Sequence, residues 1–268
     1  MSRSKKLIAF IGLAFLAIII FLVSFIRQRY IVPIIMYHYV HPNADLKDRL
    51  TVSPECFQRQ MRFLKERHYN VISLEALATL VKEKRKVPPR TIAITIDDGH
   101  RDNYNYIFPI LKKYNLPATM FVIINEIGRP EGDRLTWEEI KQMQGSGIIT
   151  FGSHSLGADP LVNIKSEEEI KRQIFASKKI LEEKLGKEIK AFSYPEGFFN
   201  AKIKKMVIDA GYRFAVSTSP GLAFPDDDLF ALKRVRISSN ADNLFIFYIE
   251  TSGYYAPIRE YQRNFRHK

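Results

Sequence analysis

The sequence predicts an α/β protein, an incomplete or distorted (β/α)7-type barrel preceded by one transmembrane helix. Three observations predict it: a 20-residue run without a charge near the N-terminus, some seven short apolar strands that alternate with amphipathic helices, and no glycine-rich phosphate loop. Short strands that alternate with helices indicate a parallel sheet. A doubly wound open sheet is the competing architecture for the same pattern.

The first element is the uncharged run at residues 7–26. As a helix it would span about 30 Å, the thickness of a bilayer's hydrocarbon core. The basic tail at residues 1–6 favours a cytoplasmic N-terminus. We therefore expect a single-pass protein of the cell membrane, whose linker (27–32) and main domain (33–268) lie outside the cytoplasm. The alternative is a cleaved signal peptide, but the run is long for one and no small-residue cleavage site follows it.

Composition limits the partners. The formal net charge is +12, so an exported domain could bind an anionic lipid or polymer, or simply present a solvated basic surface. No nucleic-acid motif is found, and we expect no nucleic-acid partner. The only cysteine, Cys56, permits no internal disulfide. Nothing in the sequence indicates an oligomer.

The main domain begins with a strand. Apolar runs predict strands at residues 33–40, 91–96, 118–123, 148–155, 189–195, 213–218 and 232–237. Capping residues and amphipathic spacing predict helices at residues 53–68, 103–114, 166–186 and 200–211, and one that begins at Thr136. Capping boxes are expected at Thr136 with Glu139 and at Ser166 with Glu169.

Polar side chains follow four of the predicted strands. They are His38, Asp97 with Asp98, His154, and Tyr194 with Glu196. In parallel barrels the chemistry lies at the carboxyl ends of the strands, so these groups should meet at one face. Two adjacent carboxylates repel each other unless a cation or a proton lies between them. Two carboxylates and an imidazole can hold a divalent metal with an open position, which favours metal-assisted hydrolysis of a carbonyl compound.

The motifs also resemble a known family. "TIDDG" (residues 95–99) looks like the first motif of the polysaccharide deacetylases, carbohydrate esterase family 4 or NodB-type domains. "SHS" (153–155) resembles their second motif, and "FSYPEG" (192–197) stands where the third is expected. "MYHYV", "DDGHRDNY", "LTWEEI" and "DAGY" are similar to the membrane-attached branch that removes acetyl groups from poly-N-acetylglucosamine-like polymers.

The resemblance implies a role for each matching residue. Asp97 would be the general base, and Asp98 and His154 would be ligands of a divalent metal, with zinc expected. A backbone N–H and the metal would stabilise the tetrahedral oxyanion. No histidine stands near the last strand, so the resemblance suggests that His38 protonates the departing amine. The alternative for His38 is a structural histidine of the first strand.

The second motif departs from the family pattern. The family has a histidine four residues after His154, where this chain has Ala158. Asp159 is the nearest oxygen donor and could be the third ligand, since zinc accepts carboxylates. The alternative is that Asp159 only begins a turn with Pro160.

The third motif also departs. Ser193 stands in place of an arginine that orients the base, and Glu196 in place of a tyrosine. The Glu196 N–H could still serve the oxyanion, which is why we count Glu196 as catalytic. Possible replacements for the arginine are Arg101, Arg234 and Arg236.

Substrate contacts are predicted for Tyr194, Pro195, Arg101 and Trp137. Trp137, the only tryptophan, could stack on a sugar ring, or it could pack at the start of its helix.

The predicted function is thus an active, membrane-anchored N-deacetylase of an N-acetylhexosamine polysaccharide. A second possibility is a weakened family member that binds glycan without turnover because the second metal histidine is Ala158. A third is a relative acting on other amides or esters.

Overall fold

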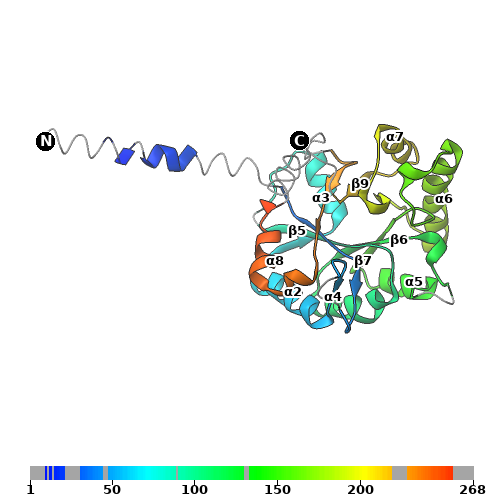
Figure 1. The fold of residues 1–268 in the computed structure, drawn as a ribbon, viewed down its shortest axis with the longest axis horizontal. Coiled ribbons are helices and arrows are strands. Elements are labelled where there is room, and N and C mark those ends of the chain that lie inside the picture. The colour runs from blue at the N-terminus through cyan, green and yellow to red at the C-terminus, as the bar shows by residue number, and fades with distance from the viewer. Residues whose placement is uncertain are drawn as a thin grey trace, which may run out of the picture. The chain divides into compact units, whose positions relative to one another are not determined.

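The computed structural model describes residues 10, 12–13, 15–21, 31–44, 48–88, 90–129, 133–218 and 228–255. The chain divides into two compact units, Met1–Ile31 and Val32–Lys268, which are described separately. In the second unit, helices surround a central set of strands, as Figure 1 shows.

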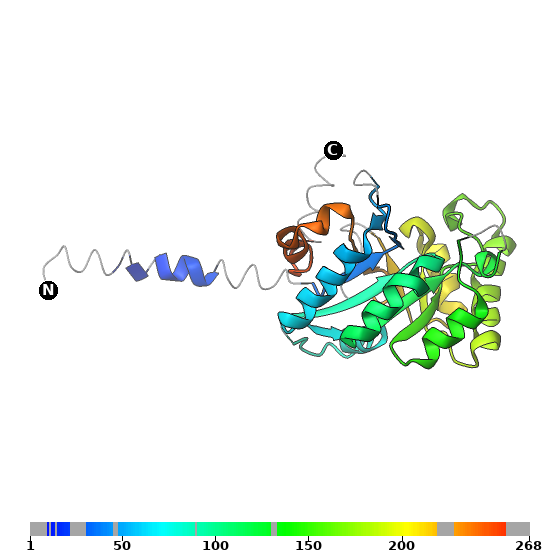
Figure 2. The ribbon, with the colours of Figure 1, turned by 90° about the horizontal axis from the view of Figure 1, so that it is seen from below.

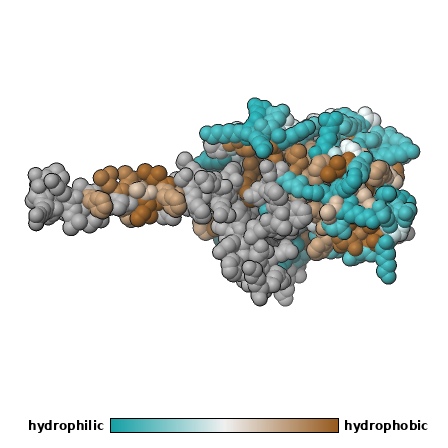
Figure 3. Space-filling view, turned by 90° about the horizontal axis from the view of Figure 1, so that it is seen from above, coloured by the Kyte–Doolittle hydropathy of each residue, from teal (hydrophilic) through white to brown (hydrophobic). Residues whose placement is uncertain are grey.

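The described residues of the first unit are helical and expose large apolar side chains, coloured brown in Figure 3. The predicted anchor lies only partly within the described residues. The predicted tail (1–6), most of the linker and residues 256–268 lie outside them. Across the described part of the chain, none of the helices combines the length and the apolar character needed to cross a membrane.

A parallel sheet forms the centre of the second unit. Its strands are β1 (Ile34–Tyr37), β4 (Asn70–Ile72), β5 (Thr91–Ile96), β6 (Ala118–Val122), β7 (Ile149–Ser153), β8 (Ala191–Ser193), β9 (Phe214–Ser217), β10 (Leu232–Lys233) and β11 (Val235–Arg236). Their order is β10-β9-β8-β7-β6-β5-β1-β11, with β4 also paired to β5, and every pair is parallel. The predicted parallel α/β fold is confirmed.

The sheet is nearly closed into a barrel by one short segment, Leu232–Arg236. Its first half, β10, pairs with β9, and its second half, β11, pairs with β1 at the other end of the strand order. Arg234 is the residue between the two halves. The chain therefore changes its pairing partner at Arg234, which places this residue where the two ends of the sheet meet.

The central strands β5 and β6 are buried on both faces, which explains their continuous apolar runs. Along β5, Ile92, Ile94 and Ile96 belong to one apolar cluster, whereas Ala93 belongs to a second. Side chains alternate between the two faces of a strand, so Thr95 and Asp97 follow Ala93 on its face. That face carries the first carboxylate of the double aspartate.

Helices pack around these strands, as the view in Figure 2 shows. They are α2 (Pro54–Glu66), α3 (Leu74–Lys82), α4 (Phe108–Tyr114), α5 (Trp137–Gly145), α6 (Glu167–Leu185), α7 (Ala201–Asp209) and α8 (Leu244–Glu250). A π-helix, η1 (Asn103–Ile107), precedes α4, and 3₁₀ turns occur at η2 (Ile124–Glu126), η3 (Leu161–Asn163), η4 (Pro195–Gly197) and η5 (Ser239–Asp242).

The capping predictions are confirmed at α5 and in part at α6. Thr136 and Glu139 form both hydrogen bonds of a capping box at α5. At α6, Ser166 caps the helix, but the Glu169 carboxylate accepts hydrogen bonds from Arg172 instead of closing the box. The elements β3 (Thr51–Val52), β4, α3 and α8 were not predicted, whereas β2 (Tyr39–Val40), which pairs with β3, lies within the strand predicted at residues 33–40.

Candidate active site

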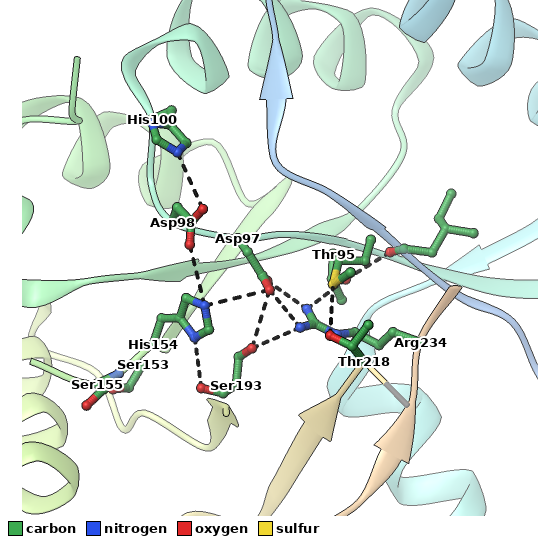
Figure 4. Close-up of polar contacts among 12 residues, drawn as sticks. Thr95, Asp97, Asp98, His100, Ser153, His154, Ser155, Ser193, Thr218 and Arg234 are labelled. Atoms are coloured by element: carbon green, nitrogen blue, oxygen red, sulfur yellow. Dashed lines mark hydrogen bonds and ion pairs between the residues drawn. The ribbon is translucent and has the colours of Figure 1, made fainter. Parts of the chain in front are cut away.

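The predicted polar residues gather at the carboxyl ends of the parallel strands. Asp97 and Asp98 follow β5, His154 follows β7, and Ser193 ends β8. In Figure 4 their side chains point toward one another, and Arg234 reaches the same cluster from the segment that closes the barrel. The expected meeting of residues from separate strands at one face is therefore observed.

Asp97 forms a buried ion pair with Arg234. The Arg234 guanidinium donates two hydrogen bonds, of 2.7 Å to Oδ1 and 2.6 Å to Oδ2 of Asp97. It donates a third, of 3.0 Å, to the Ser193 hydroxyl oxygen. Asp97 and Arg234 are only 2% and 4% exposed. Arg234, one of the three candidate arginines, therefore contacts the predicted base, and its role as the replacement for the third-motif arginine stays a prediction.

The charge on Asp97 is maintained by this pair. Burial alone raises the pKa of the Asp97 carboxyl, but the Arg234 guanidinium and the neighbouring histidines more than offset that effect and lower the pKa. Asp97 is therefore ionised at neutral pH in spite of its burial.

His154 turns its Nε2 toward the two aspartates. Its Nδ1 lies 2.8 Å from the carbonyl oxygen of Ser193, which can only accept, so Nδ1 carries the proton and donates. In the neutral ring Nε2 then has a free lone pair. This atom lies 3.5 Å from Oδ1 of Asp98 and 3.8 Å from Oδ2 of Asp97. A lone pair that faces two carboxylates calls for a cation or a proton between them.

Asp98 has a left-handed backbone, with φ of 72°, and its carboxylate lies between two imidazoles (Figure 4). Oδ1 faces His154, and Oδ2 lies 3.4 Å from Nε2 of His100. Burial raises the pKa of Asp98, but the contact with His100 and the nearby histidine charges outweigh it, so the pKa lies well below its ordinary value. His100 is buried and stacks on Tyr39, with ring centroids 3.7 Å apart.

Asp98 and His154 fit as two ligands of one divalent ion. With bonds of about 2.0–2.1 Å, two ligands of a tetrahedral zinc are about 3.3 Å apart, close to the 3.5 Å between Asp98 Oδ1 and His154 Nε2. The hydrogen bond from His154 Nδ1 to a carbonyl is the support that metal-binding histidines usually have.

A third protein ligand is not in place. Among the described residues, no group of three His, Cys, Asp or Glu side chains is arranged to hold a metal ion. Ala158 and Asp159 are both exposed. The structure does not bring Asp159 together with Asp98 and His154, so its role as a ligand stays a prediction.

His38 lies between β1 and β2, close enough to the aspartates for their charges to raise its pKa. Burial has the larger and opposite effect, so the pKa of His38 is lowered overall. Its Nδ1 is buried and has no hydrogen-bond partner among the described residues. The structure thus brings His38 to the cluster, and its role as the acid stays a prediction.

The residues of the third motif differ in exposure. Glu196 is exposed and has a left-handed φ of 54°. Tyr194 is completely buried, stacks on Phe199 and donates a hydrogen bond of 3.1 Å to the Phe230 carbonyl. Pro195 is buried too. The predicted substrate contact of the Tyr194 side chain is therefore wrong, because a side chain with no exposed surface cannot touch a polymer.

The other two predicted substrate residues do not join the cluster. Arg101 is exposed and pairs with Glu139, with 3.2 Å between Nε and Oε1. Trp137 is half-buried, packs against the core at the first residue of α5 and lies under the Lys184 ammonium. Trp137 thus packs at the start of its helix, which was the alternative to stacking on a sugar ring.

The roles of three residues near the site were not predicted. Ser193 was not expected as a hydrogen-bond partner of Arg234, and His100 and Asn103 were not expected as neighbours of the site. Asn103 Nδ2 donates a hydrogen bond of 2.9 Å to the carbonyl oxygen of His38. The segment "DDGHRDNY" was the available signal, because it continues directly from the double aspartate.

Comparisons with known proteins agree on one family. Residues 84–215 match the family model described as polysaccharide deacetylase. The chain is 31% identical over 220 residues to YxkH of Bacillus subtilis (strain 168), a candidate polysaccharide deacetylase, with 82% of this chain and 76% of that protein covered. It is 29% identical over 201 residues to the poly-beta-1,6-N-acetyl-D-glucosamine N-deacetylase of Staphylococcus aureus (strain MSSA476), covering 71% of this chain and 69% of that one.

The fold is also similar to solved structures. The Streptococcus pyogenes deacetylase PplD, solved in complex with acetate, superposes with a TM-score of 0.71 at 28% identity, over 81% of this chain and 97% of that chain.

Proposed function

Because the chain belongs to the polysaccharide deacetylase family and is a hydrolase of acetamide bonds, we propose that it is a metal-dependent N-deacetylase anchored in the cell membrane. Its proposed substrate is the N-acetylhexosamine unit of an extracellular or cell-envelope polysaccharide. The similarity to a poly-β-1,6-N-acetylglucosamine deacetylase makes oligomers of that sugar the first substrate to test.

One observation carries the proposal. Nε2 of His154 faces the carboxylates of Asp97 and Asp98 at the carboxyl ends of the strands. A divalent ion, with zinc expected, would be held by Asp98 and His154. When bound, such an ion polarises the acetamide carbonyl and lowers the pKa of a neighbouring water.

Asp97 is the proposed base. Its carboxylate is ionised at neutral pH, because the Arg234 guanidinium lowers its pKa. The two hydrogen bonds from Arg234 also hold both oxygens in a fixed orientation. A carboxylate with a lowered pKa is a weak base, so it accepts a proton only from a strongly acidified water. The proposed base therefore needs a Lewis acid in the same site to acidify that water.

His38 and Glu196 complete the proposed mechanism. His38 donates the proton to the departing amine; burial lowers its pKa overall, and the charges of Asp97 and Asp98 offset part of that effect. The backbone N–H of Glu196, in the turn after β8, is the proposed donor to the oxyanion. The exposed Glu196 carboxylate is left free to contact the substrate or its new amine.

Membrane attachment rests on the uncharged run at residues 7–26 and the basic tail before it. The proposed N-terminus is cytoplasmic, and the proposed catalytic domain lies outside the cytoplasm. The test is whether the protein stays in carbonate-washed membranes with its domain open to protease from the outer side. A mature N-terminus near residue 27 would contradict the anchor.

The enzymatic proposal is tested with the purified full chain. Acetate release from N-acetylglucosamine oligomers is measured after chelation and after adding back Zn²⁺, with Asp98→Asn as the variant that lacks a charged ligand. We expect chelation to abolish release, the ion to restore it, and Asp98→Asn to need a higher metal concentration.

A second candidate function is supported by one observation, the lack of a third metal-binding side chain among the described residues. It is a glycan-binding protein without turnover. Glycan affinity retained by a chain that binds no metal at micromolar concentration would favour this candidate over the enzyme.

A further inference from the structure

The imidazole of His38 lacks a hydrogen-bond anchor at one of its two nitrogens within the described residues. Its Nδ1 is buried and lacks a hydrogen-bond partner in the described part of the chain. His38 also falls between β1 and β2, where the regular ladder with β5 has ended. With no hydrogen bond at Nδ1, the position of the ring depends on the backbone that carries it.

Two buried side chains hold the backbone on the C-terminal side of His38, at its carbonyl and at the N–H of Val40. Asn103 Nδ2 donates a hydrogen bond of 2.9 Å to the carbonyl oxygen of His38. The N–H of Val40 donates a hydrogen bond of 3.0 Å to Oδ2 of Asp102. The two side chains are also joined, because Asn103 Nδ2 donates to Oδ1 of Asp102 at 2.5 Å. Asp102 and Asn103 are 3% and 0% exposed.

The same two residues are tied to the double aspartate. They follow Asp98 by four and five residues, and Asn103 begins the π-helix η1. π-helical turns are rare and occur often at functional sites. One short, rigid segment thus connects the proposed base and metal ligand with the backbone of the proposed acid.

The arrangement has a cost to folding. Asn103 Oδ1 is buried without a hydrogen-bond partner among the described residues, and an unsatisfied buried acceptor destabilises the folded state. Burial also raises the pKa of the Asp102 carboxyl to about 7, which means that its charged form is held at a disadvantage. A pair of apolar residues would avoid both costs but could not bind the backbone at His38 and Val40.

We propose that Asp102 and Asn103 are positioning residues that fix the backbone from His38 to Val40 and so keep the His38 imidazole against Asp97 and Asp98. The inference deepens the proposed function and rests on its assignment of His38 as the acid. Neither residue touches substrate; both act through His38.

A double-mutant cycle tests the inference in the full chain. Asn103→Leu removes the donor at nearly constant size, and His38→Ala removes the imidazole. Asn103→Leu should lower kcat on an N-acetylglucosamine oligomer by at least about 10-fold, because small misplacements of catalytic groups cost up to about 100-fold. KM and the calorimetric affinity for Zn²⁺ should stay as in the parent. In the His38→Ala background Asn103→Leu should have no further effect on kcat.

Asn70→Leu is the matched control. Asn70 also donates a side-chain hydrogen bond, of 3.0 Å to Thr91, but it lies at the opposite end of β5. This variant should leave kcat unchanged. If Asn103→Leu does not fold, Asp102→Asn replaces it in the cycle, because it keeps the size and loses one of two acceptor oxygens.

The outcomes are distinct. Equal losses of kcat from Asn103→Leu with and without His38 would overturn the positioning role and leave the proposed function intact. An unchanged kcat in Asn103→Leu would overturn it as well. Full kcat in His38→Ala would remove the acid from the proposed mechanism, and the inference with it.

Discussion

Replacing Arg234 by methionine should destabilise the protein far more than the loss of an ordinary ion pair. The guanidinium makes hydrogen bonds of 2.7 and 2.6 Å to Asp97 and of 3.0 Å to Ser193, and both charges are almost fully buried. Methionine keeps the apolar stem but leaves the Asp97 charge buried without a partner. Breaking a buried pair in this way costs about 3–5 kcal/mol.

The assay is urea unfolding followed by the fluorescence of Trp137, the only tryptophan. Arg213→Met is the matched control, because Arg213 forms an exposed two-point pair with Glu188 at 2.9 and 2.9 Å. Exposed pairs contribute about 0–1 kcal/mol. The double variant Asp97→Asn with Arg234→Met should recover much of the lost stability, since it removes the unpaired charge.

The loss should also depend on pH. The pair lowers the folded-state pKa of Asp97, so in the parent its contribution is present above the unfolded pKa of about 3.9 and is lost as the pH falls through the folded value. Without Arg234 burial raises that pKa instead, and the variant gains stability relative to the parent as the pH falls. A cost equal to that of Arg213→Met, or one independent of pH between 3 and 7, would refute this account of the pair.

Three further predictions concern the chemistry. Asp97→Asn should bind metal nearly as the parent does, yet lose at least about 100-fold in kcat, the usual scale for a general base; wild-type turnover would remove that role. His38→Ala should lower kcat and flatten the alkaline limb of the pH–rate profile, and an unchanged limb with normal turnover would make His38 structural. Asp159→Ala should weaken metal binding about 10-fold, about 1.4 kcal/mol by calorimetry, and Ala158→His should partly restore it; equal affinity in Asp159→Ala and the parent would exclude Asp159 as a ligand.

The longer strands of the barrel could be predicted from the sequence because they are mostly apolar runs, and β5 and β6 are buried on both faces. The residues that follow these strands, Asp97, Asp98 and His154, could be placed together for the same reason, since parallel strands end at one face. The strands that were missed, β3 and β4, have two and three residues, too few to show a pattern.

The parts that could not be predicted depend on distant contacts. Arg234 pairs with a residue 137 positions earlier, and nothing in the local sequence separates it from Arg101 or Arg236. The direction of a side chain at a strand end is another such case. Tyr194 was expected at the substrate, but it turns into the core against Phe199.

The central claim is that Asp98 and His154 hold a divalent ion that the reaction requires. The most direct test is Zn²⁺ titration by calorimetry of the full chain beside its Asp98→Asn and His154→Ala variants, with acetate release measured on the same samples. The account predicts one ion per chain, weaker binding in both variants, and acetate release that rises with occupancy. Acetate release at full rate from a chain shown to contain no metal would contradict it, as would equal zinc affinity in all three proteins.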